Sequence, residues 1–143
     1  MIGLVEGPLD AAAAQAQFLT AHGQDGAVAS FTGVVRGEAD YLYLDWYPGM
    51  TEASIEAIAE AARVRFGVTE VCVLHRCGRV DRGQAIVFVA ASAQHRRAAF
   101  EAVDYMMDRL KSEAALWKRE VNQEVDWWVE PRAEDAASLK RWS

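Results

Sequence analysis

The sequence is short of several residue types, and each shortage excludes a class of protein. Cysteine occurs twice, as Cys72 and Cys77, and this spacing fits neither a disulfide framework nor a Cys-x-x-Cys metal or redox pair, so we expect buried, reduced thiols. No apolar stretch approaches the ~20 residues of a membrane span, and the N-terminus lacks the pattern of a signal peptide. We therefore expect a cytoplasmic protein.

Positive charge is also in deficit, because 15 lysine and arginine residues stand against 21 aspartate and glutamate residues, for a net charge of -6. This balance argues against a general nucleic-acid-binding protein, which needs a surplus of basic side chains. Cys/His metal clusters, glycine-rich phosphate loops and Gly-x-Ser-x-Gly motifs are absent as well, so we expect no metal and no resident cofactor. The basic residues gather in the stretches 75–82, 95–97 and 111–119, which favours a small anionic ligand.

The 143 residues, 52% of them hydrophobic, fit one domain over residues 1–143. Apolar periodicity predicts three helices, with Asp10, Thr51 and Ser92 as their N-caps and with ends near residues 21, 66 and 113. Runs rich in β-branched and aromatic residues predict strands, and the order of elements is typical of an α+β fold. The strands are expected over 1–6, 26–36, 41–47, 71–76, 85–91, 116–121 and 127–130.

Two details of this fold prediction concern pairing and packing. The connection 37–40 is short enough for a hairpin between the second and third strands, and the strand 85–91 is apolar enough to be buried on both faces. In the third helix we expect one face to pack against the sheet. Its residues are Phe100, Val103, Met107 and Leu110.

Lysine is rare, and two of the three lysines, Lys111 and Lys118, bracket the end of the third helix and the strand that follows. A lysine that is partly desolvated or placed beside other cations has a lowered pKa and can act as a base or as an oxyanion partner. Simple solvation at a helix C-terminus is the competing interpretation. The spacing alone leaves both open.

His95 and Arg96 lie in the first turn of the third helix, where cations oppose the helix dipole but free backbone N–H groups favour an anion. Arg36 leaves a strand end, where its planar guanidinium suits a bound oxyanion, although solvation explains it too. Sixteen residues separate His95 from Lys111, on the order of 24 Å along a helix. If both ends serve one site, a two-fold dimer is the simplest solution.

Several blocks resemble the molybdopterin synthase catalytic (large) subunit family, in that family's order and over nearly the full chain. They are Phe31-Thr-Gly-Val-Val-Arg36, Tyr47-Pro-Gly-Met50, His75-Arg-Cys-Gly78, Ser92 to Glu101, Lys111, and Trp117-Lys-Arg-Glu120. The resemblance implies an α/β hammerhead fold and an enzyme of molybdenum cofactor biosynthesis. That enzyme would transfer sulfur to cyclic pyranopterin monophosphate and so form a dithiolene.

The resemblance also implies partners and site residues. A homodimer of this subunit would bind two small ubiquitin-like sulfur-carrier proteins, whose Gly-Gly tails bear a thiocarboxylate, in a heterotetramer. Lys111 and Lys118 match the family's essential lysines. The substrate-binding positions match Arg36, His95, Arg96 and Arg132, and the pocket-lining positions match Phe31 and Met107.

Three departures from the family pattern stand out. The chain between Arg36 and Leu44 is several residues shorter than is common, Ala115 replaces a frequent proline before the Trp-Lys pair, and Asp45 replaces a common glutamate. We expect a less rigid turn at Ala115. Two alternatives stay open: a non-catalytic anion-binding scaffold, and a sulfur transferase with a different substrate.

Overall fold

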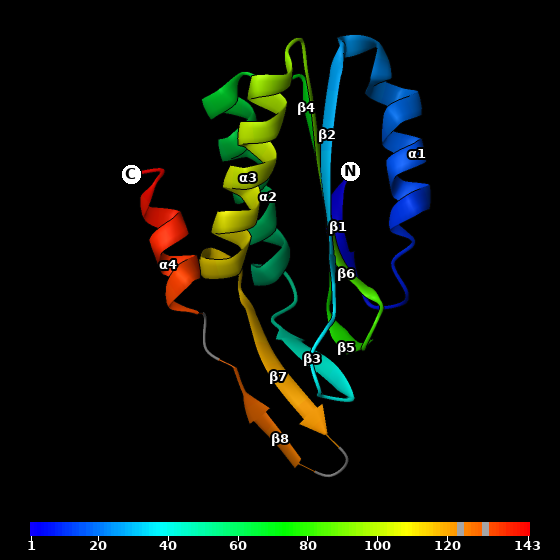
Figure 1. The fold of residues 1–143 in the computed structure, drawn as a ribbon, viewed down its shortest axis with the longest axis vertical. Coiled ribbons are helices and arrows are strands. Elements are labelled where there is room, and N and C mark those ends of the chain that lie inside the picture. The colour runs from blue at the N-terminus through cyan, green and yellow to red at the C-terminus, as the bar shows by residue number, and fades with distance from the viewer. Residues whose placement is uncertain (123–124, 130–131) are drawn as a thin grey trace.

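The computed structural model describes residues 1–122, 125–129 and 132–143, and it confirms the α+β class (Figure 1). In this part of the chain the strands form two four-stranded sheets. The helices are α1 (Ala11–His22), α2 (Met50–Phe66), α3 (Arg96–Glu113) and α4 (Ala133–Lys140), with a short 3-10 turn, η1 (Gly23–Asp25). The strands are β1 (Ile2–Val5), β2 (Ala27–Val34), β3 (Tyr41–Trp46), β4 (Glu70–Arg76), β5 (Gly78–Asp81), β6 (Ala85–Ala93), β7 (Leu116–Asn122) and β8 (Val125–Trp128).

Sheet A has the strand order β1-β4-β6-β2, with β1 parallel to β4 and the other pairs antiparallel. Helix α1 covers one face of this sheet, and α2 and α3 cover the other (Figure 1). Strand β6 is buried on both faces, as its sequence predicts, because its residues from Val87 to Ala93 alternate between the two apolar layers. Sheet A therefore forms the centre of a three-layer core.

Sheet B has the order β5-β3-β7-β8 and is antiparallel throughout. It lies beyond the end of sheet A, next to the point where α3 finishes and β7 begins (Figure 1). Its inner face contributes to a small apolar cluster. The buried members of that cluster are Val35, Leu42, Leu44 and Val80.

The expected hairpin between the second and third strands is wrong. Strand β2 pairs with β6 in sheet A, whereas β3 lies in sheet B between β5 and β7. A register shift between Gly33 and Val34 interrupts β2, and Gly37 has a φ of 106°, so the chain turns from one sheet into the other instead of folding back on itself. The connection 35–40 is thus a link between sheets.

Two predicted helix caps are also wrong. Helix α2 starts one residue before Thr51, which is fully buried inside the helix, and Gly49 is the N-cap. Ser92 belongs to β6, and His95 is the N-cap of α3. The Asp10 cap of α1 is confirmed, because its carboxylate accepts a hydrogen bond from the Ala13 N–H at 3.0 Å.

The packing face of α3 differs from the prediction at one position. Val103 and Leu110 are buried and Met107 is partly buried, but Phe100 is 62% exposed. The alanines Ala99 and Ala102 take the place next to the sheet, because small side chains let the helix approach it closely.

Strand β5 and helix α4 were not predicted. The expected strand over 127–130 corresponds to β8, although Glu130 lies outside the described residues. Among the helices of the described residues, none is long and apolar enough to cross a membrane.

Candidate functional site

The two rare lysines come together where α3 ends and strand β7 of sheet B begins. Lys111 lies in the last turn of α3, and Lys118 lies in the middle of β7, opposite Leu44 of β3. The Lys118 side chain is exposed, but partial desolvation of its ammonium lowers the pKa of Lys118, and the positive charge of Lys111 lowers it further. The lysines therefore share one electrostatic environment.

Residues at the start of α4 complete this cluster. The Asp135 carboxylate lies 3.6 Å from the ammonium of Lys111, and its negative charge raises the pKa of Lys118. Glu120 also raises the pKa of Lys118, whereas Arg132, the N-cap residue of α4, lowers it. We call Lys111, Lys118, Arg132 and Asp135 the lysine cluster. It brings together three of the eight predicted site residues.

The turn between the two lysines is held by α2. The buried hydroxyl of Thr51 donates a hydrogen bond to the Ala115 carbonyl at 2.6 Å and accepts one from the Tyr47 N–H at 2.9 Å. The Ala115 N–H donates to the Ser54 hydroxyl at 3.1 Å. A proline at position 115 has no N–H and could not make that last bond. Alanine in place of the frequent proline thus adds one hydrogen bond between this turn and α2.

Strand alternation separates Lys118 from its sequence neighbours. Trp117 and Arg119 point to the outer face of sheet B, where Arg119 pairs with Asp45 at 2.8 Å. The Arg119 guanidinium also lies over the rings of Tyr43 and Trp128, at 4.8 and 5.4 Å from their centroids. The outer face is therefore a cation–aromatic layer, and Lys118 lies on the opposite face with Leu44.

His75 is a further group close enough to interact with Lys118. Burial lowers the pKa of this half-buried histidine, and the positive charge of Lys118 lowers it further, although a hydrogen bond to the Arg76 carbonyl opposes the shift. That bond spans 2.8 Å from Nδ1. A neutral imidazole that donates through Nδ1 leaves Nε2 as an acceptor.

Two of the other predicted site residues lie apart from the lysine cluster within one chain. His95 and Arg96 are exposed at the start of α3, at the opposite end of that helix from Lys111 (Figure 1). Arg36 is exposed in the connection between the sheets. Phe31 on β2 is 43% exposed, and Met107 on α3 is partly buried against the core.

Sequence inspection missed Asp135, Glu120 and His75 as neighbours of Lys118. The acidic pair of Glu134 and Asp135 was a usable signal, because acidic residues are enriched in the first turn of a helix. Glu120 lies two positions after Lys118 on β7, so strand alternation places both on one face, whereas Asp135 and His75 approach Lys118 only in the folded chain. No three His, Cys, Asp or Glu side chains of the described residues gather closely enough to hold a metal ion.

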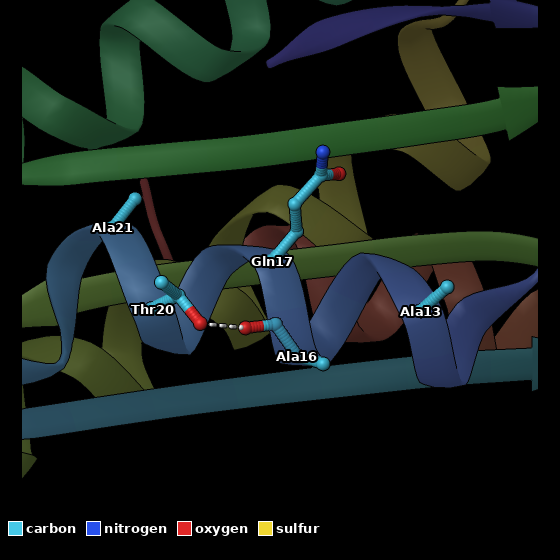
Figure 2. Close-up of a pocket in the computed structure, with 5 residues that line it drawn as sticks. All are labelled: Ala13, Ala16, Gln17, Thr20 and Ala21. Carbon is cyan, nitrogen blue, oxygen red and sulfur yellow. Dashed lines mark hydrogen bonds between the residues drawn. The ribbon is translucent and has the colours of Figure 1, made fainter.

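A shallow pocket on α1 is not a second candidate. Figure 2 shows that side chains of a single helix line it, and that the Thr20 hydroxyl is already bonded to the Ala16 carbonyl at 2.9 Å. No titratable side chain lines this pocket. Its lining residues are Ala13, Ala16, Gln17, Thr20 and Ala21.

Comparison with known protein families shows which family this chain belongs to. The family model described as MoaE protein matches residues 4–113. The chain belongs to the MoaE family. The matched segment includes Lys111 and stops short of Lys118.

Relatives of the MoaE family extend the similarity beyond that segment. The chain is 43% identical over 145 aligned positions to the molybdopterin synthase catalytic subunit of Caulobacter vibrioides, an alignment that covers 99% of this chain and 97% of the relative. A solved MoaE structure from Burkholderia ambifaria superposes with a TM-score of 0.84 at 38% identity, covering 100% of this chain and 98% of that one.

A more distant structure shares the fold. In a protein–protein complex of subunits 1 and 2 of the molybdopterin-converting factor from Helicobacter pylori, one chain superposes with a TM-score of 0.76 at 23% identity. The alignment covers 92% of this chain and 91% of that chain. This structure therefore supports the fold alone.

Proposed function

We propose that this chain is the catalytic subunit of a molybdopterin synthase. It takes sulfur from the C-terminal thiocarboxylate of a small ubiquitin-like carrier and transfers it to cyclic pyranopterin monophosphate, and two transfers form the dithiolene of molybdopterin. Membership of the MoaE family supports this activity. The structural observation that carries it is the lysine cluster, in which the Lys118 ammonium is partly desolvated beside Lys111.

The chemistry explains why two lysines are useful. Sulfur leaves the carrier when the bond between sulfur and the terminal acyl carbon breaks. Water supplies the oxygen that replaces the sulfur, so the carrier then ends in a carboxylate. Negative charge develops on the acyl oxygen, and a nearby ammonium stabilises it. We assign that role to Lys111. Lys118 assists by proton transfer, because a lowered pKa brings its proton exchange closer to neutral pH.

The phosphate and pterin of the substrate are held by cationic side chains. Arg132 belongs to the lysine cluster, and the exposed guanidinium of Arg36 extends from the connection between the sheets. Planar guanidinium groups bind phosphate oxygens in pairs, and this binding positions the carbons that sulfur attacks. Phe31 and Met107 line the pterin pocket in this proposal.

A homodimer supplies the remaining binding groups. His95 and Arg96 lie a full helix away from Lys111, so one chain cannot bring them to its own lysine cluster. In a two-fold dimer the α3 start of one copy meets the lysine cluster of the other. Each copy binds one carrier, which gives a heterotetramer, and the free, buried state of Cys72 and Cys77 fits a cytoplasmic location.

Single-turnover conversion of cyclic pyranopterin monophosphate, with a thiocarboxylated carrier, tests the proposal. We expect Lys111→Ala and Lys118→Ala each to slow dithiolene formation by about 10²–10⁴-fold, which is the usual contribution of a proton-transfer or charge-stabilising group. The matched control is Lys140→Ala, which removes the exposed lysine of α4 and should leave the rate unchanged. Melting temperatures show whether each variant is folded.

The outcomes separate the alternatives. Dithiolene from wild type, with loss in both lysine variants, supports function and site together. Undiminished product in both variants refutes the assigned roles. Carrier binding without any product from wild type favours a scaffold. Turnover of a different pterin favours an altered substrate, for which the short connection 35–40 gives a structural reason.

A further inference from the structure

The residues that follow the C-terminal end of α4 bind to the side of α3. The Arg141 guanidinium pairs with Asp104 at 3.1 Å and with Asp108 at 2.7 Å, and the Trp142 indole N–H donates to Asp108 at 2.5 Å. The Trp142 ring packs edge-on against Phe66 and Tyr105, with centroids 5.7 and 5.6 Å apart. This combination of ion pairs and ring contacts fixes α4 against the side of α3.

The same face of α3 leads directly to the lysine cluster. Asp104, Asp108 and Lys111 are spaced by one helical turn each, so they form a single row along α3. Arg141 contacts the first two members of the row and Asp135 contacts the third, so α4 runs antiparallel to α3. The anchor at Arg141 therefore determines where Asp135 lies.

We propose that Asp135 is a positioning residue for the lysine pair, and that α4 is a strap that carries it to Lys111. The idea rests on the proposed function of the lysines. The Asp135 carboxylate is 23% exposed, while the Lys111 side chain that it contacts is 54% exposed. A more buried acid that holds a more exposed lysine restricts where the ammonium can go, and restricted placement raises the rate of an acyl cleavage.

Positive and negative groups surround Lys118, and the carboxylate of Asp135 compensates part of the positive charge. Positive groups face it from α3 (Lys111) and from the N-cap of α4 (Arg132), and the half-buried His75 faces it from β4. The opposing negative groups are Glu120 on β7 and Asp135 on α4. Removing the carboxylate of Asp135 leaves the positive groups less compensated, so the pKa of Lys118 falls further.

The first test replaces the acid and measures both rate and titration. Asp135→Asn should slow single-turnover dithiolene formation by about 10-fold, and the pH–rate profile should move to lower pH. Asp135→Glu should restore most of the rate and the profile. Glu134→Gln, which neutralises an exposed acid in the same helical turn, should stay within about twofold of wild type.

A second readout does not depend on turnover. With three lysines in the chain, ¹³C-lysine labelling gives three ε-methylene signals, which single-lysine variants assign. The Lys118 signal should titrate at lower pH in Asp135→Asn than in wild type. In Asp135→Glu it should titrate at the same pH as in wild type. Arg141→Ala, which releases the anchor without touching a lysine, should move it in the same direction by a smaller amount.

Each result has a defined meaning. An unchanged Lys118 titration in folded Asp135→Asn overturns the proposal, and so does an equal effect of Glu134→Gln. An unchanged titration in Arg141→Ala overturns the strap. If wild type makes no dithiolene, the proposed function fails while the titration still decides the role of Asp135.

Discussion

Sheets A and B place their side chains in opposite settings. Sheet A is covered on both faces by helices, and its central strand β6 is buried from Val87 to Ala93. Sheet B has a small apolar cluster on one face and a cation–aromatic layer on the other, where Trp117 and Trp128 are 44% and 59% exposed. The proposed chemistry belongs to the less buried sheet.

This contrast explains how one chain combines stability with a charged site. Burial of apolar surface contributes most of the folding free energy, and sheet A with its helices supplies it. Desolvating an ammonium costs free energy, so Lys118 lies at the margin of the core, not in its centre. Helix α2 joins the two regions, because Thr51 and Ser54 hold the Ala115 turn.

The largest effect should come from emptying the core of sheet A. Phe88→Ala removes a fully buried ring and should lower the free energy of unfolding by about 3–5 kcal/mol, because the cavity cannot collapse completely. Trp128→Ala on sheet B should cost about 1 kcal/mol or less, since it loses one exposed cation–π contact. Urea denaturation of both variants measures the difference, and equal losses would contradict the division between the sheets.

An intermediate effect should follow from cutting the link between the regions. Thr51→Val keeps the shape but removes the hydroxyl that bonds Ala115 and Tyr47, which should cost about 1–3 kcal/mol. The single-turnover rate should fall as well, because the turn between the lysines loses an anchor. Thr69→Val makes the same change at an exposed threonine and should alter neither quantity. A rate equal to wild type in Thr51→Val would show that the turn is held by other contacts.

The smallest effect concerns the pH dependence of stability. Burial lowers the pKa of Lys118 in the folded state below its ordinary value of 10.5, so the unfolded chain binds this proton more tightly. The resulting penalty is fully present below the folded pKa and disappears as the pH rises towards 10.5. Lys118→Met should therefore be more stable than wild type near neutral pH, and its advantage should shrink as the pH rises.

Thermal unfolding between pH 7 and pH 10 checks this trend. Lys140→Met controls for the loss of one positive charge. An advantage of Lys118→Met that grows with pH would reverse the assigned sign.

Local patterns predicted most of the elements but not their partners. Helices α1, α2 and α3 and strand β6 follow from apolar spacing, because periodicity reflects burial. The split into two sheets does not, since a four-residue connection favours a hairpin while β3 is already paired on both edges by β5 and β7. Helix α4 is eight residues long and buries no side chain, so apolar spacing did not predict it.

The candidate site divides in the same way. The scarcity of lysine and the family resemblance selected Lys111 and Lys118, and the length of α3 correctly separated His95 from Lys111. Asp135 could not be found by spacing, because its contact with Lys111 depends on how α4 returns along α3. The roles of all eight predicted site residues remain predictions.

The pairing of β3 with β7 has a consequence for folding kinetics. Tyr41 lies opposite Val121 and Trp46 opposite Leu116, so α2, β4, β6 and α3 all intervene in the sequence. Contacts between such distant segments form slowly, because the chain must close a long loop before the pairing stabilises it. The pairing of β3 with β7 should therefore form late in folding, and a chain that has not yet formed it would not hold Lys118 beside Lys111. Such an intermediate could not release sulfur from a carrier before folding is complete.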